Sequence, residues 1–183
     1  MQIAEQKYQE NIAEYILYMY QIEDVIRAYQ FDVDAIMKNF VEPQLTDKNL
    51  APAYKKWYSK LIRDMKDQRI EKVGHLLDLN ETLIELSYLH NMLLGQANDS
   101  TYIEYNEKAQ SFINEFKQKS NLKEKNDVEL IFGAMYMKLL LKLQKKEISP
   151  ATESAFDAMR MVLAYLAKSY HKMKNGDLDF LNN

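Results

Sequence analysis

The chain has 183 residues, of which 47 % are apolar and 28 % charged, a balance typical of folded globular domains that excludes an intrinsically disordered chain. Its formal net charge of −3 is too small for long-range attraction to nucleic acid or to an anionic membrane. Because the sequence contains no cysteine, disulfides, cysteine-ligated metal sites and thiol nucleophiles are excluded.

The sequence predicts helices throughout. Only four glycines and three prolines interrupt it, and apolar residues recur at spacings of three and four, as on one face of a helix. The first predicted helix covers about residues 3–30 and carries one apolar stripe. This stripe consists of Ile12, Tyr15, Met19, Ile22, Ile26 and Tyr29.

A short second helix is predicted at about 33–41, followed by a loop that begins before Pro43. The third, at about 54–67, is amphipathic, and a fourth covers about 69–94. The pattern leaves open whether the third and fourth form one continuous helix. The residues expected to face inward from the fourth helix are Val73, Leu76, Leu77, Leu83, Ile84 and Leu94.

Three further helices are predicted at about 102–119, 128–146 and 150–174. Asp99 or Ser100, Asp127 and Ser149 are the expected N-terminal caps, and Gly176 is expected to end the last helix. The helix at 128–146 is apolar around most of its circumference, so we expect it to lie centrally in the bundle. Its apolar residues include Leu130, Ile131, Phe132, Met135, Met137, Leu139, Leu140, Leu141 and Leu143.

These elements predict an all-α protein, a single-domain bundle of six to seven helices. We expect the domain to cover residues 1–175 and a short C-terminal tail to cover 176–183. In this tail, Leu178, Phe180 and Leu181 either dock on the bundle or fray.

The sequence also predicts where the protein works. No stretch approaches the 18 uncharged apolar residues that a membrane span needs, so no membrane association is expected. Residues 1–10 carry Glu5, Lys7 and Glu10 and no long apolar core, unlike a signal or transit peptide. We therefore expect a cytoplasmic protein.

Polar residues of the first predicted helix gather on one side of it. At 100° per residue, Glu14, Gln21 and Asp24 share a lane roughly opposite the apolar stripe. The lane is either a partly solvated face with structural hydrogen bonds or the wall of a ligand site, and the rarity of unpaired buried acids favours the first. Glu23 and Arg27, at i and i+4, predict an ordinary surface ion pair.

A second polar group interrupts the apolar face of the fourth predicted helix. Asn80, Ser87 and Asn91 project into the middle of this face, and His90 lies on the same side. A buried polar group without a partner costs about 1–3 kcal/mol of stability, so we expect these four side chains to form hydrogen bonds. Their expected partners are the polar residues of the lane on the first helix. The favoured interpretation is a structural network, and the alternative is a polar pocket inside the bundle.

No metal site is predicted. A di-iron carboxylate centre needs Glu-x-x-His on two helices, and no glutamate stands three positions before any of the three histidines. Glu71, His75 and Asp78 fall near one side of a helix, but three such residues on a charged face are usually solvated.

No cofactor or catalytic residue is predicted either. With glycine only at 74, 95, 133 and 176, the chain lacks the phosphate-binding loops of nucleotide enzymes, and no serine sits in a strand-turn-helix elbow. Gly74 and Gly133 are interpreted as close helix crossings. The basic face at 55–72 is interrupted by Asp64, Asp67 and Glu71, so a nucleic-acid partner is not expected.

The segment 11–28, NIAEYILYMYQIEDVIRA, resembles the opening helix of an uncharacterised all-helical family of Bacteroidetes proteins, a domain of unknown function. The resemblance is clearest over residues 11–40, and the segment 72–76, KVGHL, is compatible with it. It implies a helical fold and a cytosolic bacterial setting, and it supplies neither an activity nor catalytic residues.

Two functions remain open. The first is a non-enzymatic helical protein that acts through protein-protein contacts or self-association, since no catalytic constellation is present. The alternative is a small-molecule binder or enzyme with a polar pocket between the first and fourth helices. The residues expected to line that pocket are Glu14, Gln21, Asp24, Asn80, Ser87, His90 and Asn91.

Overall fold

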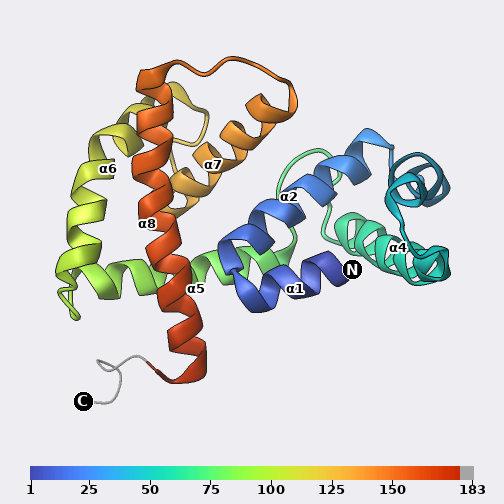
Figure 1. Cartoon of the computed structure of the whole chain (residues 1–183), viewed down its shortest axis with the longest axis horizontal. Helices are drawn as coiled ribbons and strands as arrows, with labels where there is room; N and C mark the ends of the chain where they lie inside the picture. The colour runs from blue at the N-terminus through green and yellow to red at the C-terminus, as the bar shows by residue number, and fades with distance from the viewer. Residues whose placement is uncertain (178–183) are drawn as a thin grey trace. The chain divides into compact units, whose positions relative to one another are not determined.

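The structure is a computed structural model that describes residues 1–177, and within these residues every regular element is helical (Figure 1). The all-α class is thus confirmed. The described residues form eight α-helices, one more than the upper end of the expected range. These are α1 (Gln2–Glu10), α2 (Ile12–Ala28), α3 (Val33–Ile36), α4 (Ala51–Asp67), α5 (Leu77–Leu94), α6 (Ser100–Lys119), α7 (Asp127–Leu143) and α8 (Pro150–Asn175).

The described chain divides into two compact units. Unit 1 comprises residues 1–10 and 14–81, and unit 2 comprises residues 11–13 and the chain from Thr82 onward. One domain over 1–175 stays a prediction. Of the expected tail, Gly176 and Asp177 follow α8, whereas Leu178, Phe180 and Leu181 lie outside the described residues.

The single helix expected at 3–30 is broken at Asn11. Its side-chain Oδ1 accepts a hydrogen bond of 3.0 Å from the backbone N–H of Ala13, which starts α2 as a separate helix. The apolar stripe of α2 is confirmed, because Ile12, Met19 and Ile22 are buried. Dividing the first of the seven predicted helices into α1 and α2 accounts for the eighth helix.

The segment at 33–41 is helical as predicted, but only its first turn is an α-helix. The Asp32 side chain caps α3 by accepting hydrogen bonds from the N–H groups of Asp34 and Ala35. A π-helical turn, Met37–Val41, and a 3₁₀ turn, Glu42–Gln44, follow. A further 3₁₀ turn, Lys48–Leu50, leads into α4.

The prediction for α4 is confirmed. Pro52 lies in the first turn, where its missing N–H costs no helical hydrogen bond. The buried side of the helix is made of aromatic and aliphatic residues at helical spacing. They are Tyr54, Tyr58, Leu61, Ile62 and Met65.

The predicted start of the fourth helix is wrong, because α5 begins at Leu77 and not near residue 69. Arg69 and Gly74 have φ values of 56° and 102°, which end any helix continuing from α4. The third and fourth predicted helices are therefore separate. Gly74 lies in the intervening loop instead of at a helix crossing, and Val73, expected inward, is 79 % exposed.

The buried face of α5 also differs from the prediction. Leu77 and Ile84, expected inward, are exposed, as is Tyr88. The helix carries two apolar stripes, and periodicity alone gives no basis for choosing between them. The stripe that the structure buries contains Leu79, Leu83, Leu86, Leu89 and Leu93.

In unit 2, α6, α7 and α8 pack against one another (Figure 1). Their caps follow the sequence closely: Asp99 caps α6, Ser149 caps α8, and Gly176 ends α8 with a φ of 76°. The cap of α7 is Asn126 rather than the expected Asp127, which is instead the first residue of that helix. Asn126 and Glu129 cap each other reciprocally.

Only the first half of α7 is as buried as expected. Residues from Val128 to Met135 supply the buried positions of this half, whereas Met137 and Leu143 are exposed and Leu139 to Leu141 are half-buried. Gly133 lies against the loop before α7 instead of at a helix crossing, since a Cβ there would lie 2.8 Å from the Cδ1 of Leu122. The C-terminal half of α7 therefore leaves apolar surface open to solvent.

No helix among residues 1–177 combines the length and the apolar character required to span a bilayer.

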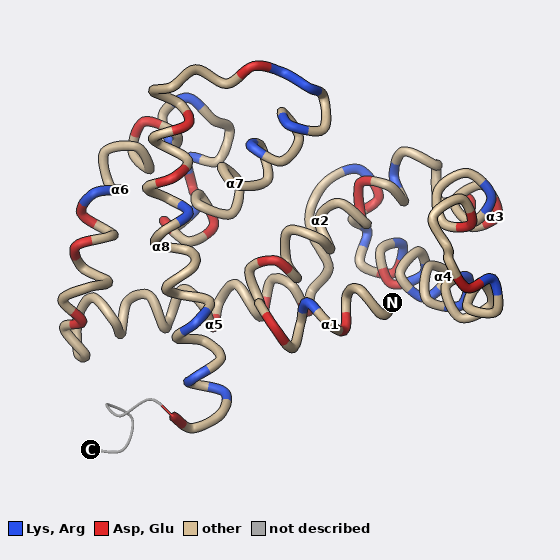
Figure 2. The backbone as a smooth tube through the Cα atoms, in the orientation of Figure 1, with Lys and Arg blue, Asp and Glu red and all other residues tan. Residues whose placement is uncertain are grey.

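The charged residues of α4 include both signs, and Figure 2 shows Lys and Arg interspersed with Asp along it. Lys60 pairs with Asp64 at 2.5 Å and Lys55 with Asp34 at 2.6 Å, so part of this basic face is neutralised. The expectation about nucleic acid stays a prediction.

Candidate functional site

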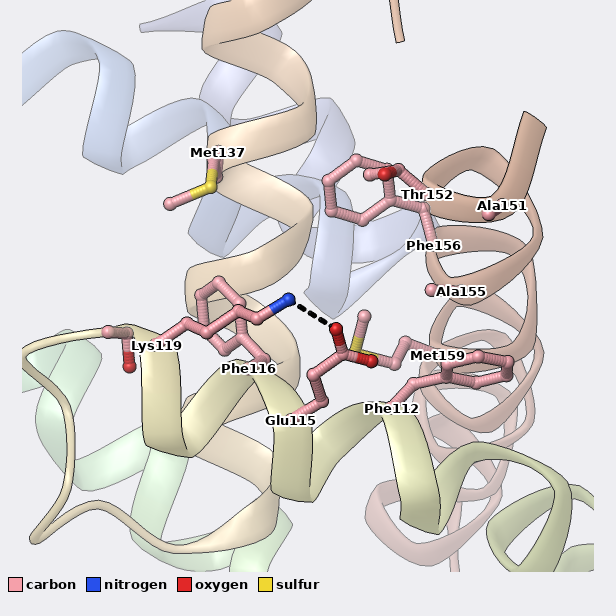
Figure 3. Close-up of a pocket in the computed structure, with 11 residues that line it drawn as sticks. Phe112, Glu115, Phe116, Lys119, Met137, Ala151, Thr152, Ala155, Phe156 and Met159 are labelled. Carbon is pink, nitrogen blue, oxygen red and sulfur yellow. Dashed lines mark hydrogen bonds and ion pairs between the residues drawn. The ribbon is translucent and has the colours of Figure 1, made fainter. Parts of the chain in front are cut away.

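An apolar pocket of about 410 Å³ opens among α6, α7 and α8 in unit 2, and we call it the unit 2 pocket (Figure 3). Its apolar lining residues are three phenylalanines, two methionines and two alanines of α8. Its lining residues are Phe112, Glu115, Phe116, Lys119, Ser120, Met137, Ala151, Thr152, Ala155, Phe156 and Met159.

Helical periodicity brings these residues together. On α6, Phe112 and Phe116 are four residues apart and lie on one face. On α8, Phe156 and Met159 lie on one face in the same way, and both are buried. The small side chain of Ala155 beside them leaves room that a larger residue would fill, and Met137 of α7 contributes its exposed thioether.

The polar groups of the pocket are few and are engaged with one another or lie at its edge. Glu115 and Lys119 form an ion pair at i and i+4 on α6, drawn as a dashed line in Figure 3. The hydroxyl of Thr152 is 2.9 Å from that of Ser149, in the cap of α8. No ring of converging donors and acceptors therefore orients a polar ligand here.

Next to the pocket, α7 and α8 are joined by a lysine that sequence reasoning missed. Lys138 is buried, and its Nζ lies 2.6 Å from Oε1 of Glu153 and 3.5 Å from Oδ1 of Asp157. The same ammonium lies 5.5 Å from the ring centroid of Phe156. The charge thus holds one pocket wall in place through a cation–π contact.

Sequence patterns alone do not single out the pocket residues. Phe112, Phe116, Phe156 and Met159 all fall on apolar stripes, and an apolar stripe looks the same whether it is fully covered or left partly open. The small residues at 151 and 155 were the available signal, because small side chains next to aromatic ones leave space between helices.

In unit 1, the loop before α5 is fastened to α2 by a buried carboxylate. Glu23 is fully buried, and its Oε1 accepts a hydrogen bond of 2.8 Å from the backbone N–H of Leu76. Its Oε2 lies 2.6 Å from Nδ1 of His75, whose ring stacks on Tyr20 at a centroid distance of 3.6 Å. The predicted surface pair of Glu23 with Arg27 is therefore wrong.

Arg27 fastens the same loop from the next turn of α2. Its guanidinium donates to the carbonyl oxygens of Ile70 and Gly74 and pairs with Asp24 at 3.0 Å. Because an arginine presents several donors in a fixed fork, one side chain satisfies two backbone acceptors and a carboxylate. These contacts form a hydrogen-bond network that ties the loop before α5 to α2.

The lane predicted on the first helix is mainly a solvent-facing one. Glu14 is exposed and pairs with Lys7 at 2.6 Å, Asp24 is exposed and pairs with Arg27, and Gln21 is half-buried. None of the three lines the unit 2 pocket. The ion pairs of Glu14 and Asp24 are thus formed within unit 1.

The prediction that Asn80 and Asn91 project into the apolar face of the fourth helix is wrong, because both are exposed on α5. Asn80 donates to the carbonyl oxygen of His75 at 3.0 Å. Ser87 donates to the carbonyl oxygen of Leu83 at 2.7 Å, and its hydroxyl lies 3.3 Å from Oδ1 of Asn126. None of these residues lines the unit 2 pocket.

His90 is the one predicted site residue that is buried. Its Nδ1 lies 2.7 Å from the hydroxyl oxygen of Tyr102 on α6, a bond whose donor depends on the ring tautomer. Burial lowers the pKa of His90 below its ordinary value, and the nearby Asp127 partly opposes that shift. Burial raises the pKa of Tyr102, so both groups are neutral at neutral pH.

Among residues 1–177, the structure groups no three His, Asp or Glu side chains as metal ligands. His75 directs Nδ1 at Glu23 of α2, and Asp78 follows it in the first turn of α5.

The model of a family described as Domain of unknown function (DUF4924) matches residues 1–177. No curated protein and no solved structure is significantly similar to the chain.

Proposed function

We propose that this chain, which belongs to the family described as Domain of unknown function (DUF4924), acts by binding another protein. The unit 2 pocket would receive apolar side chains from an amphipathic helical segment of that partner. The observation that carries the proposal is the opening of about 410 Å³ among α6, α7 and α8, whose largely apolar lining includes three phenylalanines and two methionines. The family-level resemblance of the sequence is confirmed, and the family carries no activity from which to argue.

The chemistry of the pocket favours side chains of a protein over a polar metabolite. Small-molecule sites combine an apolar wall with several converging polar groups, and here Glu115 and Lys119 already pair with each other. Apolar anchors of a helix need only a complementary apolar groove. Methionine side chains such as Met137 and Met159 adapt to different anchors because they are unbranched and flexible.

The surface beside the pocket supports the same conclusion. Met137 lines the pocket and is the first residue of the exposed C-terminal half of α7. In this half Leu143 is also exposed, and Leu139 to Leu141 are half-buried. An apolar surface continuing out of a pocket extends the area that a partner helix can cover. Lys119 and Glu115 at the rim would lie beside polar residues on the flanks of that helix.

A partner of different sequence is favoured over a second copy. The pocket is recessed, so its occupant must protrude, and the most exposed large apolar residues of α5 in unit 2 are Ile84 and Tyr88. A copy that inserted these residues into its neighbour's pocket would use two different surfaces. Such head-to-tail contacts close only when the rotation happens to form a ring and otherwise continue into filaments.

Photo-crosslinking in the protein's own cells tests the proposal. Benzoylphenylalanine replaces Met137, which is 44 % exposed and lines the pocket, and, in a matched control, it replaces Lys123, an exposed loop residue outside the lining. We expect a discrete adduct with one other protein from position 137 and none from position 123. In a second chain, Ala155→Trp fills the pocket and should reduce that adduct at least about fivefold.

The controls separate failure of the proposal from failure of the variant. Circular dichroism and thermal melting check that the Ala155→Trp chain keeps its helices, and Thr152→Phe provides a second way to fill the pocket. An adduct that contains only this chain would show self-association instead. Equal adducts from positions 137 and 123, or an adduct unchanged by both filling substitutions, would contradict the proposal.

We further propose a cytoplasmic setting in bacteria of the Bacteroidetes group. The support is the resemblance of the chain to a family of Bacteroidetes proteins, which is clearest over residues 11–40. Immunoblots of cell fractions test the location: the protein should be found with cytoplasmic markers, and recovery with periplasmic or membrane markers would contradict this.

A further inference from the structure

Unit 1 holds a second pocket, of about 550 Å³, whose lining differs in character from that of the unit 2 pocket. We call it the unit 1 pocket. Its walls come from α1, α2, α4 and the first turn of α5, together with Gln68 and Leu76. Aromatic rings and carboxylates line the same space, so its binding chemistry is independent of the protein-binding function proposed above.

The aromatic part of the wall consists of Tyr8, Tyr15 and Trp57. Tyr8 and Tyr15 meet edge to face, with ring centroids 5.1 Å apart and an interplanar angle of 80°. This arrangement turns the rings in different directions around the space. Tyr8 is 51 % exposed, so its ring is accessible from solvent.

Carboxylates outnumber cations in the lining. Glu5, Asp64 and Asp78 line the pocket together with one basic side chain, Lys60. Lys60 pairs with Asp64 at 2.5 Å. The lining therefore carries an excess of negative charge.

The negative charge acts on the aromatic wall itself. The pKa of Tyr15 is raised, first by burial and then by the charge of Asp78, with smaller contributions from Tyr8 and Glu23. The field of Asp78 therefore reaches the ring that forms one side of the space. A group that carries positive charge would be attracted by this field and by the faces of the rings.

We propose that the unit 1 pocket binds a small organic cation, a quaternary or substituted ammonium compound. Its charged centre would lie against the rings of Trp57 and Tyr8, within reach of Asp64 and Asp78. Aromatic faces attract cations through their quadrupole, and the attraction grows as the site excludes water. An anionic ligand would face the carboxylates, and a neutral one would gain only the apolar contacts.

Trp57 makes the test direct, because it is the only tryptophan in the chain and it lines the pocket. The full chain is titrated with choline, and in parallel with 3,3-dimethylbutan-1-ol, which replaces the ammonium nitrogen with carbon. We expect a saturable change in tryptophan fluorescence with choline and binding at least about tenfold weaker for the neutral alcohol. Raising the salt concentration should weaken choline binding only.

Three substitutions locate the site. Asp64→Asn and Asp78→Asn should each weaken choline binding at least about fivefold, while Asp67→Asn, on the same helix as Asp64 but outside the lining, should leave it unchanged. All three residues lie at least partly at the surface, and circular dichroism confirms that each variant is folded. Trp57→Phe removes the signal, so calorimetry measures binding to that variant.

The outcomes decide the proposal. Three results would overturn the proposal. They are the absence of saturable choline binding, equal binding of choline and the neutral alcohol, and choline binding that neither Asp64→Asn nor Asp78→Asn weakens. Because Ala155→Trp alters only the unit 2 pocket, it should leave choline binding unchanged whatever its effect on protein partners.

Discussion

Glu23 and His75 lie 52 positions apart in the chain and meet with 2.6 Å between Oε2 and Nδ1. Glu23 is fully buried on α2, whereas the side chain of His75 is 34 % exposed on the loop before α5. The same carboxylate accepts the N–H of Leu76, so a single buried acid fixes two consecutive loop residues. The conformation of this loop therefore depends on one side chain of another element.

The first prediction concerns this carboxylate. Glu23→Ala should lower the free energy of unfolding by about 3 kcal/mol, because it leaves the N–H of Leu76 without its acceptor and opens a cavity. Glu23→Gln should cost less, since the amide oxygen still accepts from that N–H. Urea denaturation measures the loss, and hydrogen exchange of the Leu76 amide should speed up in the alanine variant.

Glu14→Gln is the matched control for that experiment. Glu14 lies on the same helix and also pairs with a basic residue, Lys7, but its side chain is 58 % exposed. Exposed pairs contribute little, so this variant should stay within about 0.5 kcal/mol of the parent. Equal losses for Glu14→Gln and Glu23→Ala would contradict a special role for the buried acid.

Gly74 should not tolerate a side chain. Its φ of 102° lies where L-residues are strained, and a Cβ would lie 3.2 Å from Cγ2 of Ile70. Gly74→Ala should therefore destabilise unit 1 by about 1–3 kcal/mol. Thermal melting followed by circular dichroism checks this, with Lys72→Ala as an exposed control in the same loop. Unchanged melting of both variants would show that the loop relaxes without cost.

The orientation of α5 is tested by two neighbouring residues. Leu83 is buried, whereas Ile84 is 68 % exposed. Leu83→Glu should destabilise the chain by more than about 3 kcal/mol because it buries a charge, and Ile84→Glu should change stability by less than about 0.5 kcal/mol. Chemical denaturation compares the two. A larger loss for Ile84→Glu than for Leu83→Glu would contradict the burial of the Leu83 side of α5.

His90 should make unit 2 less stable in mild acid. Its pKa is lowered in the folded chain, so the unfolded chain binds the proton more readily and stability rises with pH. The stability that depends on a neutral His90 is fully present above the ordinary histidine pKa of about 6.5. It is lost as the pH falls below that value, by at most about 1.4 kcal/mol per pH unit.

The variant His90→Gln isolates this contribution. Tyr102 and Asp127 face His90, so the glutamine keeps a polar group beside the tyrosine hydroxyl while removing the titrating ring. Urea denaturation at pH 7.5 and 5.0, followed by circular dichroism, gives the difference for each chain. The parent should lose more stability between the two values than the variant, and equal losses would contradict the assignment.

The sequence by itself determined the helical class and most of the helix ends. Asp99, Ser149 and Gly176 act where a short polar residue begins a helix or a glycine ends one, because capping depends on neighbours in the chain. The buried side of α4 followed from periodicity, since only one of its faces is apolar.

Tertiary structure alone decided the features that depend on distant residues. Residues 69–76 have the composition of a helix, yet Glu23 and Arg27 hold them as a loop. Two apolar stripes of α5 compete equally in sequence, and packing buries one of them. The pockets arise because the faces of neighbouring helices meet incompletely, and a residue pattern along the chain does not encode this. Helix propensity and periodicity act within one helix. The burial of a helix face depends on which other elements pack against it.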